Sequence, residues 1–422
     1  MKRKLLLILT AIVTLSLAAC GQSVAADVVK SDKPRVTAPD TTEAELKTLV
    51  AGNSAFAFDL YKSLKTKDGN LFYSPYSLST ALAMTYAGAR TDTEKQMAAT
   101  LHFDLTQARL HPAFDSLDLE LGKRGQNLKG NETFKLNNVN AIWGQKDYTF
   151  QPAYLDILAE DYGAGLRVLD FKQSPDASRV TINDWVSGQT NSRIKDLIPQ
   201  GVIDTLTRLV LTNAIYFNAT WDSPFKKEAT KDGQFNLLDG SNVTVPMMRQ
   251  SASFNYTAGD NYQAVELPYS GKELSMVILV PKSGQFAALE NSLNATQMSA
   301  IINNLKTSYV SLTMPKFKYD SSFGLKGTLS AMGMPVAFTD AADFSGMTGN
   351  RELVIKEVVH KAYVAVDEAG TEAAAASGVI MGASSAPLTP VELTVDRPFI
   401  FLIRDIKTGT ILFLGRVINP KA

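Results

Sequence analysis

A run of small residues near the end of the 422-residue chain constrains its fold more than any other feature. Residues 364–386 contain no proline, and their only charged side chains are those of Asp367, Glu368 and Glu372. Loops normally carry turn residues, whereas this segment alternates like a strand, with side chains pointing to two faces in turn. One face is small at its leading end and apolar behind, and it comprises Thr371, Ala373, Ala375, Ser377, Val379, Met381 and Ala383. Such a segment is suited to entering a sheet, with Gly370 ahead of it as a flexible pivot.

Two other structures are compatible with the same residues. Alanine is the best helix former, and Thr371 or Asp367 would cap a helix that starts here. A plain surface loop is the second alternative. Taken alone, the segment favours helix or loop, so the choice depends on the rest of the chain.

The remaining sequence predicts a mixed α+β fold in one large domain, residues 43–422. Thr42 and Glu45 form a capping box before a helix that ends at Asp68-Gly69. Further helices are expected from Ser77 and from Thr91. Apolar runs predict strands at 134–143, 209–217 and 274–280, and a C-terminal hairpin at 399–403 and 410–417. No linker or repeat interrupts the chain after residue 42.

The N-terminus has the pattern of an export signal. Residues 1–19 combine three basic residues, an apolar run and small residues before Cys20, the single cysteine. The end of this pattern resembles the bacterial lipobox, which implies a lipidated Cys20; an incidental cysteine beside an ordinary cleavage site is the alternative. Gly21 is not the aspartate of an inner-membrane retention signal, so an outer-membrane lipoprotein is expected, on the periplasmic or cell-surface face. Residues 20–42 are predicted to be a flexible tether, which reaches roughly 25 Å for about 20 residues.

Charge and composition exclude several functions. Removing the three N-terminal basic residues with the signal leaves 39 basic against 42 acidic residues, which favours neither nucleic acid nor an anionic membrane. His102, His111 and His360 are the only histidines, and the first two lie in a polar, loop-like stretch. No zinc spacing, phosphate loop, dinucleotide motif or serine-hydrolase elbow occurs. We therefore expect no enzyme activity, no metal and no cofactor.

Seven ordered sequence blocks resemble the serpin family of serine protease inhibitors. They begin at residues 70, 182, 209, 245, 312, 358 and 396 and include NLFYSPYSLSTALAMTYAGAR, LVLTNAIYFNATWDSPF, VVHKAYVAVDEAGTEAAAAS and DRPFIFLIRDIKTGTILFLGRVINP. This resemblance implies a serpin fold, with three β-sheets, about nine helices and an exposed reactive-centre loop that joins two of the sheets.

The resemblance also implies a mechanism. A target protease cleaves the loop, is trapped as an acyl-enzyme, and is carried along as the loop inserts into the central sheet. The hinge of inhibitory members matches Glu368, Gly370, Thr371, Glu372, Ala373, Ala374, Ala375 and Ala376. The family's spacing from Glu368 puts the scissile bond at Ser384-Ser385. Measured back from Arg397 the loop is longer than the family pattern, so Met381, Ala383 and Ala386 remain alternatives.

Further positions resemble the regions of the family that control opening of the central sheet. Ser74, Ser77, Asn213 and His360 match the buried polar shutter, and Trp185 matches the breach tryptophan at the top of that sheet. Their alternative interpretation is a hydrogen-bonded core histidine and a buried aromatic side chain.

Two functions of different classes follow. The first is a monomeric suicide-substrate inhibitor of serine proteases with small or apolar primary specificity, elastase-like or subtilisin-like. Trypsin-like targets are disfavoured because no Lys or Arg occurs between Lys361 and Arg397. The second is a non-inhibitory serpin that acts as a binding or carrier protein.

Overall fold

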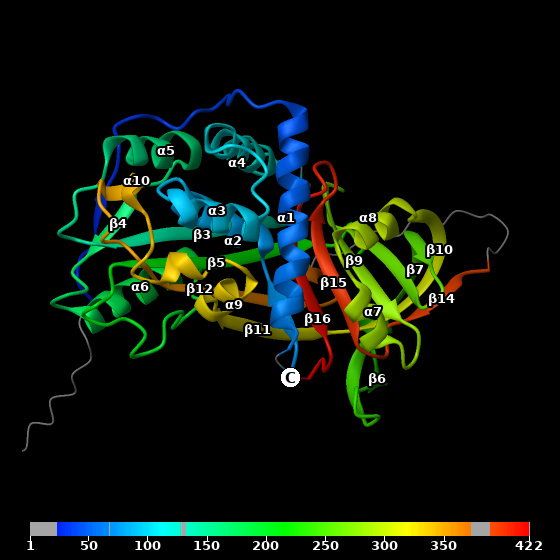
Figure 1. Ribbon diagram of the computed structural model, residues 1–422. Helices are drawn as coiled ribbons and strands as arrows, with labels where there is room; N and C mark the ends of the chain where they lie inside the picture. Colours follow the sequence, from blue (N-terminus) through cyan, green and yellow to red (C-terminus); the bar gives the residue numbers. More distant parts are fainter. Residues whose placement is uncertain (1–22, 67, 127, 129–131, 373–388, 422) are drawn as a thin grey trace, which may run out of the picture.

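The computed structural model describes residues 23–66, 68–126, 128, 132–372 and 389–421 (Figure 1). Within these residues the α-helices are α1 (Glu43–Leu64), α2 (Pro75–Tyr86), α3 (Thr91–Leu101), α4 (Gln107–Leu121), α5 (Pro152–Tyr162), α6 (Pro175–Gln189), α7 (Phe286–Ser292), α8 (Ala295–Asn303), α9 (Lys326–Met332) and α10 (Ser345–Thr348). Two short 3-10 helices are η1 (Lys227–Ala229) and η2 (Pro335–Phe338).

The strands fall into two hydrogen-bonded groups. The first, a seven-stranded central sheet, comprises in spatial order β1 (Asp27–Val29), β4 (Leu166–Leu169), β3 (Phe134–Gln145), β5 (Leu209–Thr220), β13 (Gly370–Thr371), β12 (Ile355–Val366) and β11 (Phe317–Gly324). The second comprises β14 (Val391–Thr394), β10 (Lys306–Pro315), β7 (Asn242–Ala258), β8 (Tyr262–Pro268), β9 (Leu274–Pro281), β15 (Phe399–Asp405), β16 (Ile411–Val417) and β2 (Leu71–Tyr73), with β6 (Lys231–Asn236) paired to β7.

The 17-residue strand β7 explains why two groups are seen where three sheets were expected. Its first part pairs with β6, its middle with β10 and its last four residues with β8. One continuous strand therefore joins what would otherwise be two sheets. The fold is the expected α+β arrangement, with ten α-helices among the described residues.

The central sheet is covered on both faces. Along β3 and β5, Ile142 and Leu211 belong to the main core, while Trp143 and Val210 belong to a second cluster under α6. Because neighbouring residues in a strand point to opposite faces, a strand buried on both sides is apolar throughout, as predicted for residues 209–217. In Figure 1, α2 and α3 lie over one face of this sheet.

Local signals set the helix boundaries, with two differences from the sequence-based expectations. The capping box at Thr42 and Glu45 is present at the start of α1. The helix expected from Ser77 instead begins at Pro75, with Ser74 as its N-cap and the amide of Ser77 donating to the Ser74 side chain. The polar stretch expected to be loop is helix α4, in which His111 is buried.

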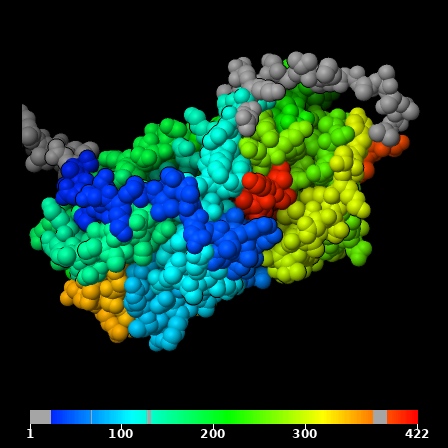
Figure 2. Space-filling model, turned by 90° about the horizontal axis from the view of Figure 1, so that it is seen from above, coloured from blue at the N-terminus to red at the C-terminus, as the bar shows by residue number. Residues whose placement is uncertain are grey.

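The largest difference concerns the N-terminal segment. Residues 24–36, called here the N-terminal strap, were expected to belong to a flexible tether. Strand β1 of the strap instead pairs antiparallel with β4 and forms an edge of the central sheet. Figure 2 shows the dark-blue N-terminal residues lying along the surface of the green and cyan elements. Cys20 and the signal segment lie outside the described residues.

Candidate functional site

The hinge predicted from the sequence lies at one end of the central sheet. After β12 the chain turns back through residues 367–369, and β13 enters between β5 and β12. Thr371 is opposite both Ala219 of β5 and Val366 of β12, and both pairings are antiparallel. Beyond this point β5 and β12 pair directly and in parallel, from Ile355 to Ala362 on β12. The sheet therefore holds the first two residues of an additional strand.

Gly370 and Thr371 fit this position for different reasons. A Cβ atom on Gly370 would lie 2.1 Å from the carbonyl oxygen of Ala219, so no side chain can be accommodated there. Thr371 is fully buried, and its hydroxyl lies 2.7 Å from the hydroxyl of Tyr269. Tyr269 is stacked on Trp221 at 4.6 Å between ring centroids. The hinge thus rests on an aromatic pair.

The turn that precedes β13 is tied to the second sheet by polar contacts. The Asp367 carboxylate accepts from the amides of Ala369 and Gly370, which closes the turn. Glu368 is buried, yet it accepts from Lys316 Nζ and Thr230 Oγ1, both at 2.7 Å. Burial alone would raise the pKa of Glu368, but these two hydrogen bonds hold it below its usual value.

Glu372, the last described residue of the hinge, points away from Thr371. Its Oε1 lies 2.6 Å from Nε of Arg193, in the segment after α6. Its amide donates to the carbonyl of Ala365, and Asn218 Nδ2 donates to its carbonyl. Burial raises the pKa of Glu372 although Arg193 opposes the change. Arg193 was not anticipated from the sequence, because its contact with Glu372 spans distant parts of the chain.

The four residues that resemble the shutter form one buried cluster under the closed part of the sheet. His360 on β12 lies opposite Asn213 on β5, and both are fully buried. The amide of Ser74 donates to His360 Nε2, so the proton is on Nδ1, which donates to Asn213 Oδ1. Asn213 Nδ2 in turn donates to Ser77 Oγ. Burial lowers the pKa of His360 to about 3, which keeps the imidazole neutral.

Two members of this cluster were missed in the sequence. Asn138 and Asn140 on β3 both accept from Ser77 Oγ, and Asn140 also accepts from Asn213 Nδ2. Their signal was available: three asparagines interrupt the predicted strand at 134–143, although asparagine is unfavourable in strands.

The prediction for Trp185 is wrong in position. Trp185 lies on α6 with its ring 5.3 Å from that of Trp143, near the start of β5. The hinge lies at the other end of β5, nine residues away, about 30 Å at ~3.3 Å per residue. The tryptophan at the hinge is Trp221, whose Nε1 donates to the carbonyl of Asp367.

Several predicted site residues lie outside the described residues. They are the hinge alanines and the candidate cleavage positions, namely Ala373, Ala374, Ala375, Ala376, Met381, Ala383, Ser384, Ser385 and Ala386. Their roles stay predictions. Within the described ranges no group of three or more His, Cys, Asp or Glu side chains is placed to hold a metal ion. Among the helices described, none is both long and apolar enough to span a bilayer.

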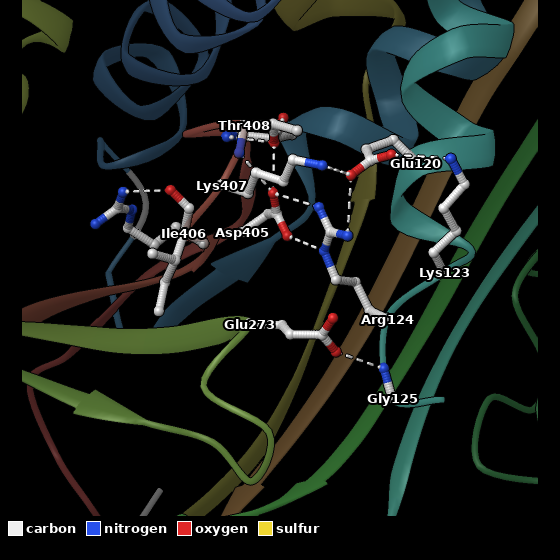
Figure 3. Close-up of polar contacts among 11 residues, drawn as sticks. Glu120, Lys123, Arg124, Gly125, Glu273, Asp405, Ile406, Lys407 and Thr408 are labelled. Carbon is white, nitrogen blue, oxygen red and sulfur yellow. Dashed lines mark hydrogen bonds and ion pairs between the residues drawn. The ribbon is translucent and has the colours of Figure 1, made fainter. Parts of the chain in front are cut away.

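A second polar network joins the end of α4 to the turn between β15 and β16 (Figure 3). Arg124 Nε lies 2.6 Å from the fully buried Asp405, and Arg124 Nη1 lies 3.2 Å from Glu120. Glu120 also pairs with Lys407 at 2.6 Å. Hydrogen bonds from Lys407 and the neighbouring cations lower the pKa of Glu120 to about 2. The network fixes the start of the connection from α4 to β3, an interior strand of the central sheet.

A groove of about 790 Å³ lies beside this network, between α1, α4 and the chain that follows the strap. Its acids are paired: Glu43 with Lys47, Asp118 with Arg35, and Glu120 with Lys407. The groove therefore offers no unpaired carboxylate that would select a ligand.

Comparison with known proteins agrees with this geometry. The family model described as "Serpin (serine protease inhibitor)" matches residues 51–420. An uncharacterised serpin-like protein of Thermococcus kodakarensis is 42% identical over 90% of this chain and 87% of its own length. Leukocyte elastase inhibitor A of Mus musculus is 40% identical over 89% of this chain and all of its own.

Two solved structures illustrate the range of similar folds. Tengpin, a thermophilic serpin in the native state, has a TM-score of 0.82 at 28% identity and covers 94% of this chain and 100% of its own. Human thyroxine-binding globulin, complexed with its ligand, has a TM-score of 0.80 at 30% identity and covers 89% of this chain and 99% of its own. The chain belongs to the serpin family.

Proposed function

We propose that this protein inhibits serine-type endopeptidases as a suicide substrate. The observation that carries the proposal is the position of β13, whose two residues are antiparallel to both β5 and β12. A strand that continues from Thr371 would replace the parallel β5–β12 pairing by two antiparallel ladders. Loop insertion in serpins is an established case of strand addition and of released strain.

Energy considerations support this route. Continuing β13 from Thr371 to Ser384 adds backbone hydrogen bonds along both neighbours, each worth ~0.5–1.5 kcal/mol net. The total is on the order of 10 kcal/mol, which is enough to offset the cost of distorting the active site of the trapped protease. Antiparallel pairing is also slightly more stable per residue than the parallel pairing it replaces. The inhibitor supplies no nucleophile; the protease does.

The face pattern of the loop fits the sheet. Thr371 faces the buried aromatic pair, so the residues in phase with it, Ala373 and Ala375, would enter the same buried face on insertion. Small side chains there would pass between existing strands without overpacking the core.

The proposed targets are elastase-like or subtilisin-like proteases. No Lys or Arg occurs between Lys361 and Arg397, so the loop offers a trypsin-like protease no primary residue. A relative that is 40% identical carries the name leukocyte elastase inhibitor A, which supports small or apolar specificity. Ser384-Ser385 is the proposed scissile bond, with bonds at Met381, Ala383 and Ala386 as alternatives.

We further propose that the protein works as a monomer on a membrane. The lipobox-like sequence that ends at Cys20 supports export and lipid attachment, with the outer membrane as destination. Mass spectrometry of the membrane-bound protein tests this: an acylated Cys20 at the N-terminus is expected.

The alternative is a carrier serpin, which the similarity to thyroxine-binding globulin favours. The hinge distinguishes the two, because Gly370, Thr371 and the alanines after it carry nothing that hinders insertion. The groove beside α1 and α4 is a candidate ligand site, but the acids that line it are paired with neighbouring cations and leave no free carboxylate to recognise a ligand.

The test is incubation with an elastase-like protease, subtilisin and trypsin, followed by denaturing electrophoresis and mass spectrometry. An adduct that survives SDS, with release of a C-terminal peptide, is expected with the first two. The first residue of that peptide identifies the scissile bond. Complete cleavage without an adduct across the panel would contradict inhibition.

A matched pair of variants tests insertion itself. Thr371→Arg puts an unpaired charge at a buried position, which is costly, and it should convert the inhibitor into a substrate. Thr205→Arg makes the same change on an exposed loop and should leave inhibition intact. Equal inhibition by both variants would exclude insertion as the driving step.

A further inference from the structure

The N-terminal strap is attached to the domain at its first residues. The amide of Val24 donates to Thr181 Oγ1 on α6 at 2.8 Å, and Thr181 Oγ1 lies 2.6 Å from the carbonyl oxygen of Val24. Val24 and Ala26 pack against the hydrophobic cluster under α6. Strand β1 then pairs with all but one residue of β4. The strap is therefore held within a few residues of Cys20.

The middle of the strap is held by α5. Ser31 Oγ donates to Asp156 at 2.6 Å, and Lys33 Nζ lies 3.1 Å from Asp156 and 3.2 Å from Glu160. The amide of Val36 donates to the carbonyl of Glu160 at 2.9 Å. Main-chain and side-chain contacts thus alternate along this part of the strap.

The far end of the strap is fixed by a partly buried ion pair. Arg35 lies 2.7 Å from Asp115, whose side chain is fully buried, and 2.7 Å from Asp118, both on α4. Its side chain lies against Gly163, where a Cβ atom would be 2.9 Å from Arg35 Cδ. In Figure 1 this dark-blue segment runs past β4 and α5 before it enters α1.

These contacts change the reach of an anchor at Cys20. Only four peptide steps separate Cys20 from Val24, which span at most about 14 Å at ~3.5 Å per residue. A domain of about 380 residues is roughly 50 Å across. Because the tether is much shorter than the domain is wide, only the part of the surface near the start of the strap can contact the bilayer.

The hinge lies at the opposite end of the central sheet from the start of the strap. Strand β4 pairs with β3 at Trp143–Gln145, next to Leu209 at the start of β5, whereas the hinge pairs with Ala219 and Thr220. These two positions on β5 are about 36 Å apart at ~3.3 Å per residue. In Figure 1, α6 and β14 lie at opposite ends of the molecule.

Given a lipid on Cys20, as proposed above, we propose that the strap fixes the orientation of the domain on the membrane. The end formed by β1, β4 and α6 faces the lipid surface, and the loop-bearing end points away from it toward proteases in solution. Several charges at this end are paired with one another, namely Asp27 with Lys146, Asp147 with Lys172, and Asp176 with Arg179, so they offer the lipid surface little net charge. The short chain between lipid and domain, docked on α6 and β4, sets which end faces the membrane.

Energy transfer to the bilayer tests this orientation. With Cys20 acylated, a second cysteine is the only free thiol, since the chain has no other. Asp184→Cys on α6 and Thr307→Cys on β10 are both exposed and lie at the two ends. Each variant is labelled with a donor dye and bound through its lipid to phosphatidylethanolamine–phosphatidylglycerol vesicles that contain an acceptor-labelled lipid. Transfer from position 184 should be several-fold more efficient than from position 307.

A linker variant supplies the control. Inserting about 20 Gly and Ser residues between Ser23 and Val24 leaves the strap docked but restores a reach of roughly 25 Å. The difference between positions 184 and 307 should then shrink strongly. Equal transfer from the two positions without the linker, or a non-acylated Cys20, would overturn the proposal. Trapping of an elastase-like protease on the same vesicles is scored separately, so loss of inhibition and loss of orientation are distinguishable.

Discussion

The two halves of the gap between β5 and β12 differ in what holds them. At the hinge end the strands are parted by β13, and the contacts there are a hydroxyl pair, an ion pair and a glycine that fits closely. At the closed end the strands pair directly over a fully buried cluster built on His360 and Asn213. The hinge contacts can be released one at a time, whereas the bonds of the buried cluster must be broken together.

This difference indicates where resistance to strand entry is located. A new strand meets weak, separable contacts first and a cooperative polar cluster later. Buried hydrogen bonds are directional and expensive to leave unmade, so the cluster resists partial opening. The following predictions test that division, from the largest expected effect to the smallest.

Removing the centre of the cluster should cost most. Asn213→Ala removes the side chain that His360 Nδ1, Ser77 and Asn140 share as a hydrogen-bond partner. Each buried polar group left unsatisfied costs about 1–3 kcal/mol of stability. We expect a loss of about 3–5 kcal/mol in the free energy of unfolding, measured in urea. Asn303→Ala, at an exposed helix end, is the control and should change stability by less than about 0.5 kcal/mol. A similarly small loss for Asn213→Ala would contradict a cooperative cluster.

The histidine of the cluster should make stability pH-dependent. Burial lowers the pKa of His360 to about 3, so the folded state binds its proton less readily than the unfolded chain does. Stability is then fully present above about pH 6.5 and decreases toward pH 3, by about 3 kcal/mol between pH 6.5 and pH 4.

The matched variant is available within the same chain. Burial also lowers the pKa of His111 on α4 to about 3. His360→Gln and His111→Gln should therefore each remove part of the acid-induced loss, while only the former should also change loop insertion. If neither variant flattens the stability–pH curve, histidine burial is not its cause.

At the hinge end, Gly370→Ala should have an intermediate effect. The added Cβ would lie 2.1 Å from the Ala219 carbonyl oxygen and would displace β13 from the sheet. We expect the free energy of unfolding to fall by roughly 1–3 kcal/mol, the range for overpacking. A changed emission of Trp221, beside the hinge, would accompany the loss. Gly188→Ala on α6, where the new Cβ meets nothing within 4 Å, should instead stabilise slightly.

The smallest effect is expected for the ion pair at Glu372. Arg193 is half exposed, so Arg193→Ala should cost no more than about 1 kcal/mol, and less at high salt. Loss of the arginine should also raise the pKa of Glu372 further, because burial already raises it. Lys47→Ala, which breaks a fully exposed pair with Glu43, is the comparison and should have no measurable effect. Equal losses of stability in the two variants would show that the hinge ion pair contributes no more than an ordinary surface pair.

Local signals in the sequence predicted the parts of the fold that depend on near neighbours. The capping box at Thr42, the apolar strands and the C-terminal hairpin needed no knowledge of distant residues. The position of the hinge residues followed from the family resemblance, and the structure places Gly370, Thr371 and Glu372 at the sheet.

Long-range contacts account for what was missed. The strap looked like a tether because the acids that bind Arg35 come 80 and 83 residues later, on a helix taken for a loop. The sequence-based prediction named Trp185 and did not consider Trp221, because nothing in a single sequence states which end of β5 receives the hinge. Only the pairing of Gly370 with Thr220 decides that.

The pairing of β5 with β12 has a consequence for the order of events during folding. Leu209 and Ile355 are far apart in sequence, whereas the loop follows β12 directly after a short turn. Contacts between residues close in sequence form faster than contacts between distant ones. If the loop that follows β12 had a high strand propensity, it would pair with β12 before β5 does.

The alanines and glycines of the loop counter this kinetic advantage. Both are depleted in strands, so a hairpin made from them is weak in isolation. We expect this early hairpin to form and unfold repeatedly until β5 pairs with β12. A loop enriched in Val or Ile would instead form a stable hairpin with β12 during folding and block that pairing. The low strand propensity of the loop therefore gives the newly made chain time to reach its active form.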